Sequence, residues 1–201
     1  IHEGNSDWFA ETILSEAGDD VNGNYPMGGY ITFNIIPNFS QNYYFGIRRY
    51  PYSTDLLKNP LTYKDIDPNQ AIAHAGVPLS PLFSPFDPRN AGEVHNGGEV
   101  WCVTLWEVRA KLIAKYGWAV GNFLALRTVF DGERLSPPNP NFLQLRDAIL
   151  QADLVDNAGA NQTEIWAAFA KRGMGVSATS PASDTTVGVV EAYDVPGLAI
   201  A

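Results

Sequence analysis

Apolar residues recur at helical spacing through the second half of the chain. Segment 99–116 is the clearest case, because Trp101, Leu105 and Val108 lie on one stripe of a helix and Gly117 follows its end. The same spacing predicts three more helices. They cover residues 122–131, a segment that begins at Pro140 with Asn139 as its cap, and residues 163–171. The second half of the chain is therefore predicted to be helical.

The first half of the chain is less regular. Residues 1–17 are predicted to form a helix, whereas the Tyr/Phe/Ile-rich stretch 30–53 fits either short strands or a helix. Residues 59–90 are rich in proline and are predicted to form a long ordered surface loop, and the loosely alternating tail 176–201 suggests an edge strand. These patterns predict a mainly α fold. Residues 1–175 would form one helical lobe with an irregular, Pro-rich first half and a few short strands.

The composition is that of a globular domain and argues against several classes of function. Of 201 residues, 45% are apolar and 17% are charged, and 13 basic against 22 acidic side chains give a net charge of −9. Because nucleic-acid backbones require a basic surface, no nucleic-acid partner is expected. No apolar run reaches the roughly 18 residues of a membrane-spanning helix, so no membrane segment is expected. Cys102, the single cysteine, is expected to be a buried, unreactive thiol.

An acidic pair near the start and one histidine far downstream are the strongest candidates for chemistry. Glu3 and Asp7 lie four residues apart, on one face of the predicted first helix. His95 is expected in a glycine-flanked turn just before the helix at 99–116. Carboxylates and histidines serve metal-assisted hydrolysis, but solvated acids and a helix-capping histidine would have the same spacing. His2-Glu3 resembles the start of a zinc-binding His-Glu-x-x-His helix, yet Ser6 stands where the second histidine is needed.

A calcium site is the weaker interpretation of the loop that follows the first helix. The spacing Asp20-x-Asn22-x-Asn24 is similar to that of a calcium-binding loop. The glycine expected next is Tyr25, and no glutamate closes the loop. A solvated turn is therefore the preferred interpretation.

Five motifs in order along the chain resemble those of fungalysin-type metallopeptidases, which are relatives of thermolysin. The run Glu-Gly-Asn-Ser-Asp-Trp-Phe-Ala at 3–10 is similar to the EGWSDxxA signature of that family. The other matches are GIRxYPYST at 46–54 with NPLTY at 59–63, EVHxxGEVW at 93–101, and the closing helices at 139–149 and 165–173. Together these motifs cover about residues 3–175.

The resemblance implies a role for each matching residue. Glu3 would be the third zinc ligand, and Asp7 would hold one of the ligand histidines. Arg48 would bind a carbonyl of the substrate, although the adjacent Arg49 leaves the choice between the two open. His95 would donate a hydrogen bond to the oxyanion that forms when the metal-bound water attacks the peptide carbonyl. Zinc is therefore the cofactor implied for the complete enzyme.

The chain also departs from the family pattern. Asn5 replaces the usual tryptophan, and the 201 residues contain no His-Glu-x-x-His segment, so two zinc ligands and the general base are missing. Since the chain starts at Ile1 rather than Met, it is interpreted as a segment of a longer protein. The resemblance implies that this protein is a secreted zinc endopeptidase that cleaves internal bonds of peptides or proteins, and that the chain is its C-terminal segment. Without the N-terminal half of the catalytic domain it is expected to retain no zinc and to be inactive.

Two other functions remain open. The first is a non-catalytic peptide- or protein-binding module derived from a metallopeptidase, with Arg48 and His95 lining its groove. The second is a different hydrolase that uses His95 with Asp87 or Glu93, and it is disfavoured because no Ser or Cys has a nucleophile-elbow context.

Overall fold

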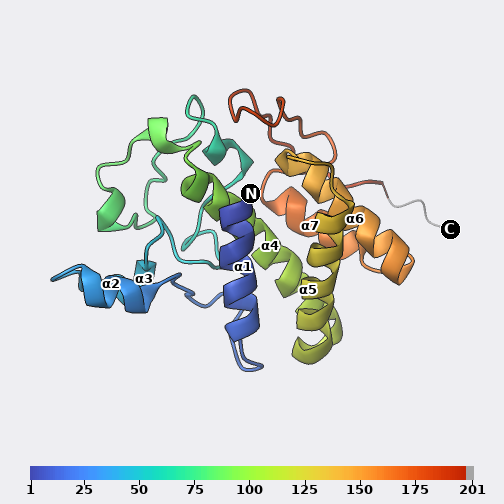
Figure 1. The fold of residues 1–201 in the computed structure, drawn as a ribbon, viewed down its shortest axis with the longest axis horizontal. Coiled ribbons are helices and arrows are strands. Elements are labelled where there is room, and N and C mark those ends of the chain that lie inside the picture. Colours follow the sequence, from blue (N-terminus) through green and yellow to red (C-terminus); the bar gives the residue numbers. More distant parts are fainter. Residues whose placement is uncertain (198–201) are drawn as a thin grey trace. The chain divides into compact units, whose positions relative to one another are not determined.

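The computed structural model describes residues 1–197 and is mainly helical, as predicted (Figure 1). It divides into two compact units. The first comprises Ile1–Leu61 and Asp65–Trp106, and the second comprises Thr62–Lys64 and the chain from Glu107 onward. Helix α4, Val94–Tyr116, contributes to both units. Every candidate site residue named above belongs to the first unit.

In the first unit, α1 (His2–Leu14) ends three residues earlier than expected. It lies very close to the first turns of α4, and two glycines permit this approach. A Cβ on Gly4 would lie 2.3 Å from the carbonyl oxygen of Gly98, and a Cβ on Gly98 would lie 2.8 Å from the backbone nitrogen of Gly4. Any larger side chain at either position would push the helices apart. The two helices therefore bring Glu3, which precedes Gly4, close to His95, which lies one helical turn before Gly98.

The expected start of the long helix is corrected, because α4 begins at Val94 rather than near residue 99. The Glu93 carboxylate accepts the backbone N–H groups of His95 and Asn96 at 3.0 and 3.1 Å, which satisfies donors that a helix start leaves unpaired. His95 therefore lies in the first turn of the helix and not in a turn before it.

Between α1 and α4 the chain is ordered but irregular. The ambiguous stretch 30–53 contains the short helices α2 (Gly29–Ile35) and α3 (Asn42–Phe45), which pack against each other. The Pro-rich stretch is an ordered loop, as predicted, with three 3₁₀ turns. These are η1 (Tyr63–Ile66), η2 (Pro81–Phe83) and η3 (Pro88–Asn90).

The second unit contains α5 (Trp118–Leu135), α6 (Phe142–Asn157) and α7 (Gln162–Lys171), and α5 and α6 lie side by side (Figure 1). The expected cap at Asn139 is wrong. Asn141 caps α6 instead, because its side chain accepts the backbone N–H of Gln144 while the Gln144 side chain accepts that of Asn141.

The short strands expected in the first half and in the tail are reduced to isolated bridges within residues 1–197. These bridges pair Tyr25 with Tyr52, Met174 with Ala192, and Thr179 with Val190. The last four residues of the expected edge strand at 176–201 lie outside the described residues.

Candidate active site

Glu3 and His95 meet at the first turns of α1 and α4. The distance between Glu3 Oε2 and His95 Nε2 is 3.5 Å, and the two side chains are 43% and 49% exposed. Both groups can therefore reach a ligand from solvent while remaining close to each other. A carboxylate and an imidazole placed in this way can bind a cation together, or can stabilise charge that develops between them.

Glu93 fixes the orientation of the histidine. Its Oε1 lies 2.7 Å from His95 Nδ1. Because a carboxylate accepts hydrogen bonds, this contact places a proton on Nδ1 and leaves Nε2 directed at the Glu3 side. Partial burial acts to raise the pKa of Glu93, but the hydrogen bonds from His95 and from the Asn96 backbone hold it below its ordinary value. From the sequence, Glu93 was a candidate only as the partner of His95 in a hydrolase of another type.

Asp7 lies one helical turn after Glu3 and is buried with Arg48. Arg48 donates from Nε to Asp7 Oδ2 at 2.6 Å and from Nη2 to Asp7 Oδ1 at 2.8 Å, and the Tyr52 hydroxyl donates to Oδ2 at 2.5 Å. Burial acts to lower the pKa of Arg48, but the hydrogen bond to Asp7 and nearby negative charges hold it above its usual range. Burial, together with the negative charge of neighbours such as Asp7, raises the pKa of Tyr52. The Asp7 carboxylate is thus fixed by Arg48 and Tyr52, one helical turn after Glu3.

Arg49 has a different environment from Arg48. Its backbone N–H and its Nε donate to the buried Glu99 carboxylate at 2.9 and 3.1 Å, and its Nη2 donates to the carbonyl oxygen of Asn96 at 2.6 Å. Burial raises the pKa of Glu99 despite these contacts. Arg49 therefore ties the chain after α3 to α4, whereas Arg48 bonds to Asp7 of the acidic pair.

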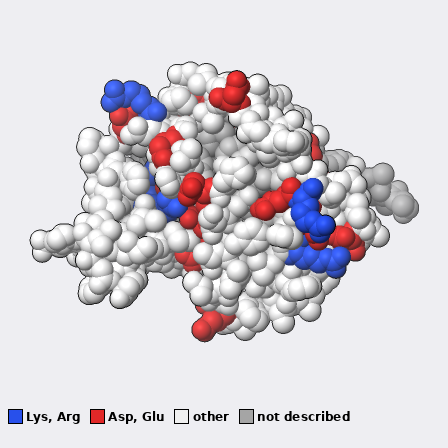
Figure 2. All heavy atoms as spheres, in the orientation of Figure 1, with Lys and Arg blue, Asp and Glu red and all other residues white. Residues whose placement is uncertain are grey.

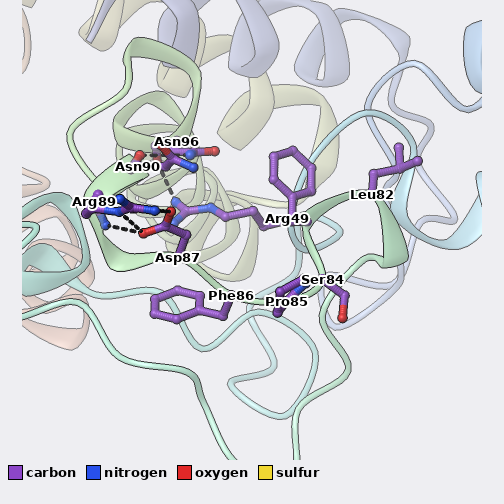
Figure 3. A pocket seen from close by; sticks show the side chains of 10 residues that line it. Arg49, Leu82, Ser84, Pro85, Phe86, Asp87, Arg89, Asn90 and Asn96 are labelled. Carbon is purple, nitrogen blue, oxygen red and sulfur yellow. Dashed lines mark hydrogen bonds and ion pairs between the residues drawn. The ribbon is translucent and has the colours of Figure 1, made fainter.

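A pocket of about 580 Å³ opens beside Arg49 and the first turn of α4 (Figure 3). One wall of the pocket is the loop 82–90, which contributes apolar side chains. Asn96, the residue that follows His95, also lines the pocket. Arg89 and Asp87 form an ion pair in this loop, with Arg89 Nη2 2.6 Å from Asp87 Oδ2 (Figure 3). The pocket is lined by Arg49, Leu82, Phe83, Ser84, Pro85, Phe86, Asp87, Arg89, Asn90 and Asn96. A pocket lined by both apolar and polar side chains suits the binding of a large apolar side chain with a polar backbone nearby.

Two other features considered from the sequence, the single cysteine and the loop at 20–24, lie in surroundings that explain them without a role in chemistry. Cys102 is completely buried, and burial raises the pKa of its thiol well above the ordinary value, as expected for an unreactive cysteine. Asp20 accepts the backbone N–H of Asn22 at 2.9 Å, in keeping with a solvated turn. No group of three or more His, Cys, Asp or Glu side chains within residues 1–197 is placed to hold a metal ion. Glu3 and His95 by themselves do not make up such a group.

On the face drawn in Figure 2, acidic side chains and smaller groups of basic ones are scattered among uncharged residues. No helix within residues 1–197 is both long and apolar enough to cross a membrane.

A carboxylate beside an oriented imidazole can take part in metal-assisted hydrolysis. The profile of the fungalysin metallopeptidase family (M36) matches residues 1–178. The chain belongs to that family.

Several proteins with similar sequences are named as extracellular metalloproteinases. The chain is 38% identical over 199 residues to "Extracellular metalloproteinase MEP" of Pyricularia oryzae. The aligned region covers 92% of this chain and 26% of that protein. It is 39% identical over 189 residues to "Extracellular metalloproteinase mep" of Aspergillus fumigatus, and this alignment covers 88% of this chain and 25% of that protein. "Extracellular metalloproteinase 1" of Trichophyton equinum is 37% identical over 189 residues, with 88% and 26% covered. The chain thus spans about a quarter of the length of these relatives.

Two parts of the site were not foreseen from the sequence. Tyr52, which bonds to Asp7, lies inside the YPYST motif, and its position there was a usable signal. The close contact of Gly4 with Gly98 gave no signal, because the partners are 94 residues apart in the chain and neither glycine has a positive φ.

Proposed function

We propose that this chain is a segment of a secreted zinc endopeptidase that hydrolyses internal bonds of peptide or protein substrates. The meeting of Glu3 with His95 at 3.5 Å carries the proposal, because the family resemblance assigns the two residues to one site and they are 92 positions apart in the sequence. Membership of the metallopeptidase family and the names of the extracellular relatives support it.

Glu3 is the proposed zinc ligand from this chain. Its carboxylate is half-exposed, lies at the start of α1 and belongs to a donor type that zinc accepts. A catalytic zinc site needs three protein ligands, so the others are proposed to come from polypeptide outside the 201 residues, in the N-terminal half of the catalytic domain. The longer relatives support this arrangement. The isolated chain is accordingly proposed to retain no zinc and to be inactive.

The other site residues are proposed to position the substrate and to stabilise charge. Zinc, when bound, supplies a Lewis acid that activates water. His95 is proposed to act in its doubly protonated form, in which Nδ1–H donates to Glu93 and Nε2–H donates to the oxyanion of the attacked carbonyl. Asp7 orients a ligand histidine from outside the chain. Arg48 uses two of its five N–H donors on Asp7, and its remaining donors serve a substrate carbonyl. The pocket beside Asn96 accepts a large apolar side chain of the peptide.

The competing function is a peptide- or protein-binding module that has lost catalysis. The same pocket and the buried Arg48 would serve it, so only the metal distinguishes the two. We therefore test the full open reading frame for zinc content by mass spectrometry and for cleavage of a quenched fluorescent peptide.

Three single variants of the full protein separate the proposed roles. Glu3→Gln should lose both zinc and activity, because an uncharged amide replaces a ligand. His95→Gln should keep its zinc and lose roughly 10²–10³-fold in kcat, the usual effect of removing one oxyanion donor. Glu16→Gln, which changes an exposed acid just beyond α1, should alter neither. Full zinc content and activity in Glu3→Gln would refute the assignment of Glu3, and zinc-free, peptide-binding protein would favour the binding module.

A further inference from the structure

Two Asn-x-Ser/Thr sequences occur in the chain, at Asn38-Phe39-Ser40 and at Asn161-Gln162-Thr163. In a protein that passes through a eukaryotic secretory pathway, this sequence is the acceptor for an N-linked oligosaccharide, provided that the middle residue is not proline. Both sequences satisfy that condition. The environment of each asparagine then decides which of them the folded protein can carry in modified form.

Asn38 lies at the corner of a tight turn that follows α2. The backbone N–H of Phe39 donates to the carbonyl oxygen of Ile36 at 3.3 Å, Pro37 occupies the second position of the turn, and Asn38 has a φ of 66°. These are the features of a type II turn, in which the third residue needs a positive φ and asparagine tolerates it better than most residues. Asn38 and Ser40 are both exposed. The carboxamide is therefore presented to solvent at the corner of a turn.

Asn161 has the opposite environment. It is 1% exposed, and its Nδ2 donates to Asp153 Oδ1 at 2.7 Å while its Oδ1 accepts from the Tyr116 hydroxyl at 2.8 Å. Asp153 is itself completely buried. A sugar on Asn161 Nδ2 would need space that the interior lacks and would disrupt the hydrogen bond to a buried carboxylate. Chains modified there could not complete this fold.

We propose that Asn38 is an N-glycosylation site of this protein and that Asn161 is not. In the transfer step, the Asn38 carboxamide nitrogen forms a bond to C1 of the first sugar of a lipid-diphosphate-linked oligosaccharide. The bond from C1 to the diphosphate oxygen breaks, the lipid diphosphate leaves with the electron pair, and the amide nitrogen loses one proton. No oxidant or reductant is required. The inference rests on the extracellular location contained in the proposed function, but not on peptidase activity.

The surroundings of Asn38 give the glycan a physical role. Four large apolar side chains of α2, immediately before the turn, are exposed: Tyr30, Ile31, Phe33 and Ile35. Apolar side chains gathered on a surface favour association. A bulky, hydrophilic oligosaccharide attached three residues beyond Ile35 would shield this part of the surface and increase solubility.

The test uses the full open reading frame, secreted from a fungal host, and the glycan is mapped on peptides before and after treatment with peptide-N-glycosidase. The expected result is conversion of Asn38 to Asp by the glycosidase, with Asn161 unmodified. Ser40→Ala should abolish the modification at Asn38 and Ser40→Thr should preserve it. Thr163→Ala, the matched change at the other sequence, should leave the glycan pattern unchanged.

Asn38→Asp provides a second removal of the site that keeps a residue suited to the left-handed backbone conformation. It should lose the glycan without loss of thermal stability. Secreted protein with unmodified Asn38, a glycan on Asn161, or protein found only inside the cell without glycan would each overturn the proposal. An inactive protein with glycosylated Asn38 would instead refute the peptidase assignment and leave this site established.

Discussion

Asp7→Asn removes a negative charge from the protein interior with almost no change in side-chain shape. The Asp7 and Arg48 side chains are each 7% exposed, and both carboxylate oxygens accept hydrogen bonds from the guanidinium. The substitution leaves the Arg48 charge buried without its counter-ion and turns an amide donor toward the guanidinium donors. Removing one partner of a buried pair typically costs about 3–5 kcal/mol, and we expect a loss of this size in the free energy of unfolding.

Urea denaturation of the 201-residue chain, followed by tryptophan fluorescence, measures this loss, because the fully buried Trp8 is the neighbour of Asp7. The matched control is Asp131→Asn, the same substitution at a more exposed ion pair on α5, where Arg127 Nε lies 3.6 Å away and is 47% exposed. Exposed pairs contribute about 0–1 kcal/mol, so this control should change little.

A double variant separates the charge effect from general damage to the fold. Arg48→Met in the Asp7→Asn background removes the stranded charge and should recover part of the lost stability, since buried pairs can often be replaced by apolar groups without large cost. If Asp7→Asn were as stable as the wild type, or if adding Arg48→Met made it less stable still, the account of Asp7 as a carboxylate held by Arg48 would be wrong.

Three further results are expected. Burial raises the pKa of Tyr50 from 10.0 to about 12. The stability that its neutral form contributes is therefore fully present below pH 10 and lost between pH 10 and 12, by about 2–3 kcal/mol. Tyr50→Phe should remove this contribution, whereas the loss that comes from the buried Tyr52 and Tyr63, whose pKa values are also raised, should remain. Cys102 should react with a thiol reagent only after denaturant is added, and fast labelling of folded protein would contradict its burial. Glu93→Gln in the full protein should lower kcat without loss of zinc, because it removes the carboxylate that orients His95 through Nδ1. An unchanged kcat would exclude that role.

Local sequence patterns predicted secondary structure reliably in segments whose conformation depends on their own residues. The helix at 99–116 was recognisable because its apolar stripe is regular, and the Pro-rich stretch was recognisable as a loop because proline removes backbone donors. Boundaries were less reliable. Asn139 and Asn141 are equally good caps by residue type, and the reciprocal bond with Gln144 decided for Asn141. Likewise, the start of α4 depended on the Glu93 side chain folding back over the backbone of His95 and Asn96.

The sequence by itself determined the family, the helical class and the identities of the residues with chemical potential, because these depend on residue types and short spacings. Only the tertiary structure decided which of them meet. Arg48 and Arg49 are adjacent in the chain, yet one bonds to Asp7 and the other to Glu99. Glu3 faces His95 because two glycines let α1 and α4 approach closely. Contacts between distant segments depend on packing in three dimensions, and the spacing of residues along one chain does not encode them.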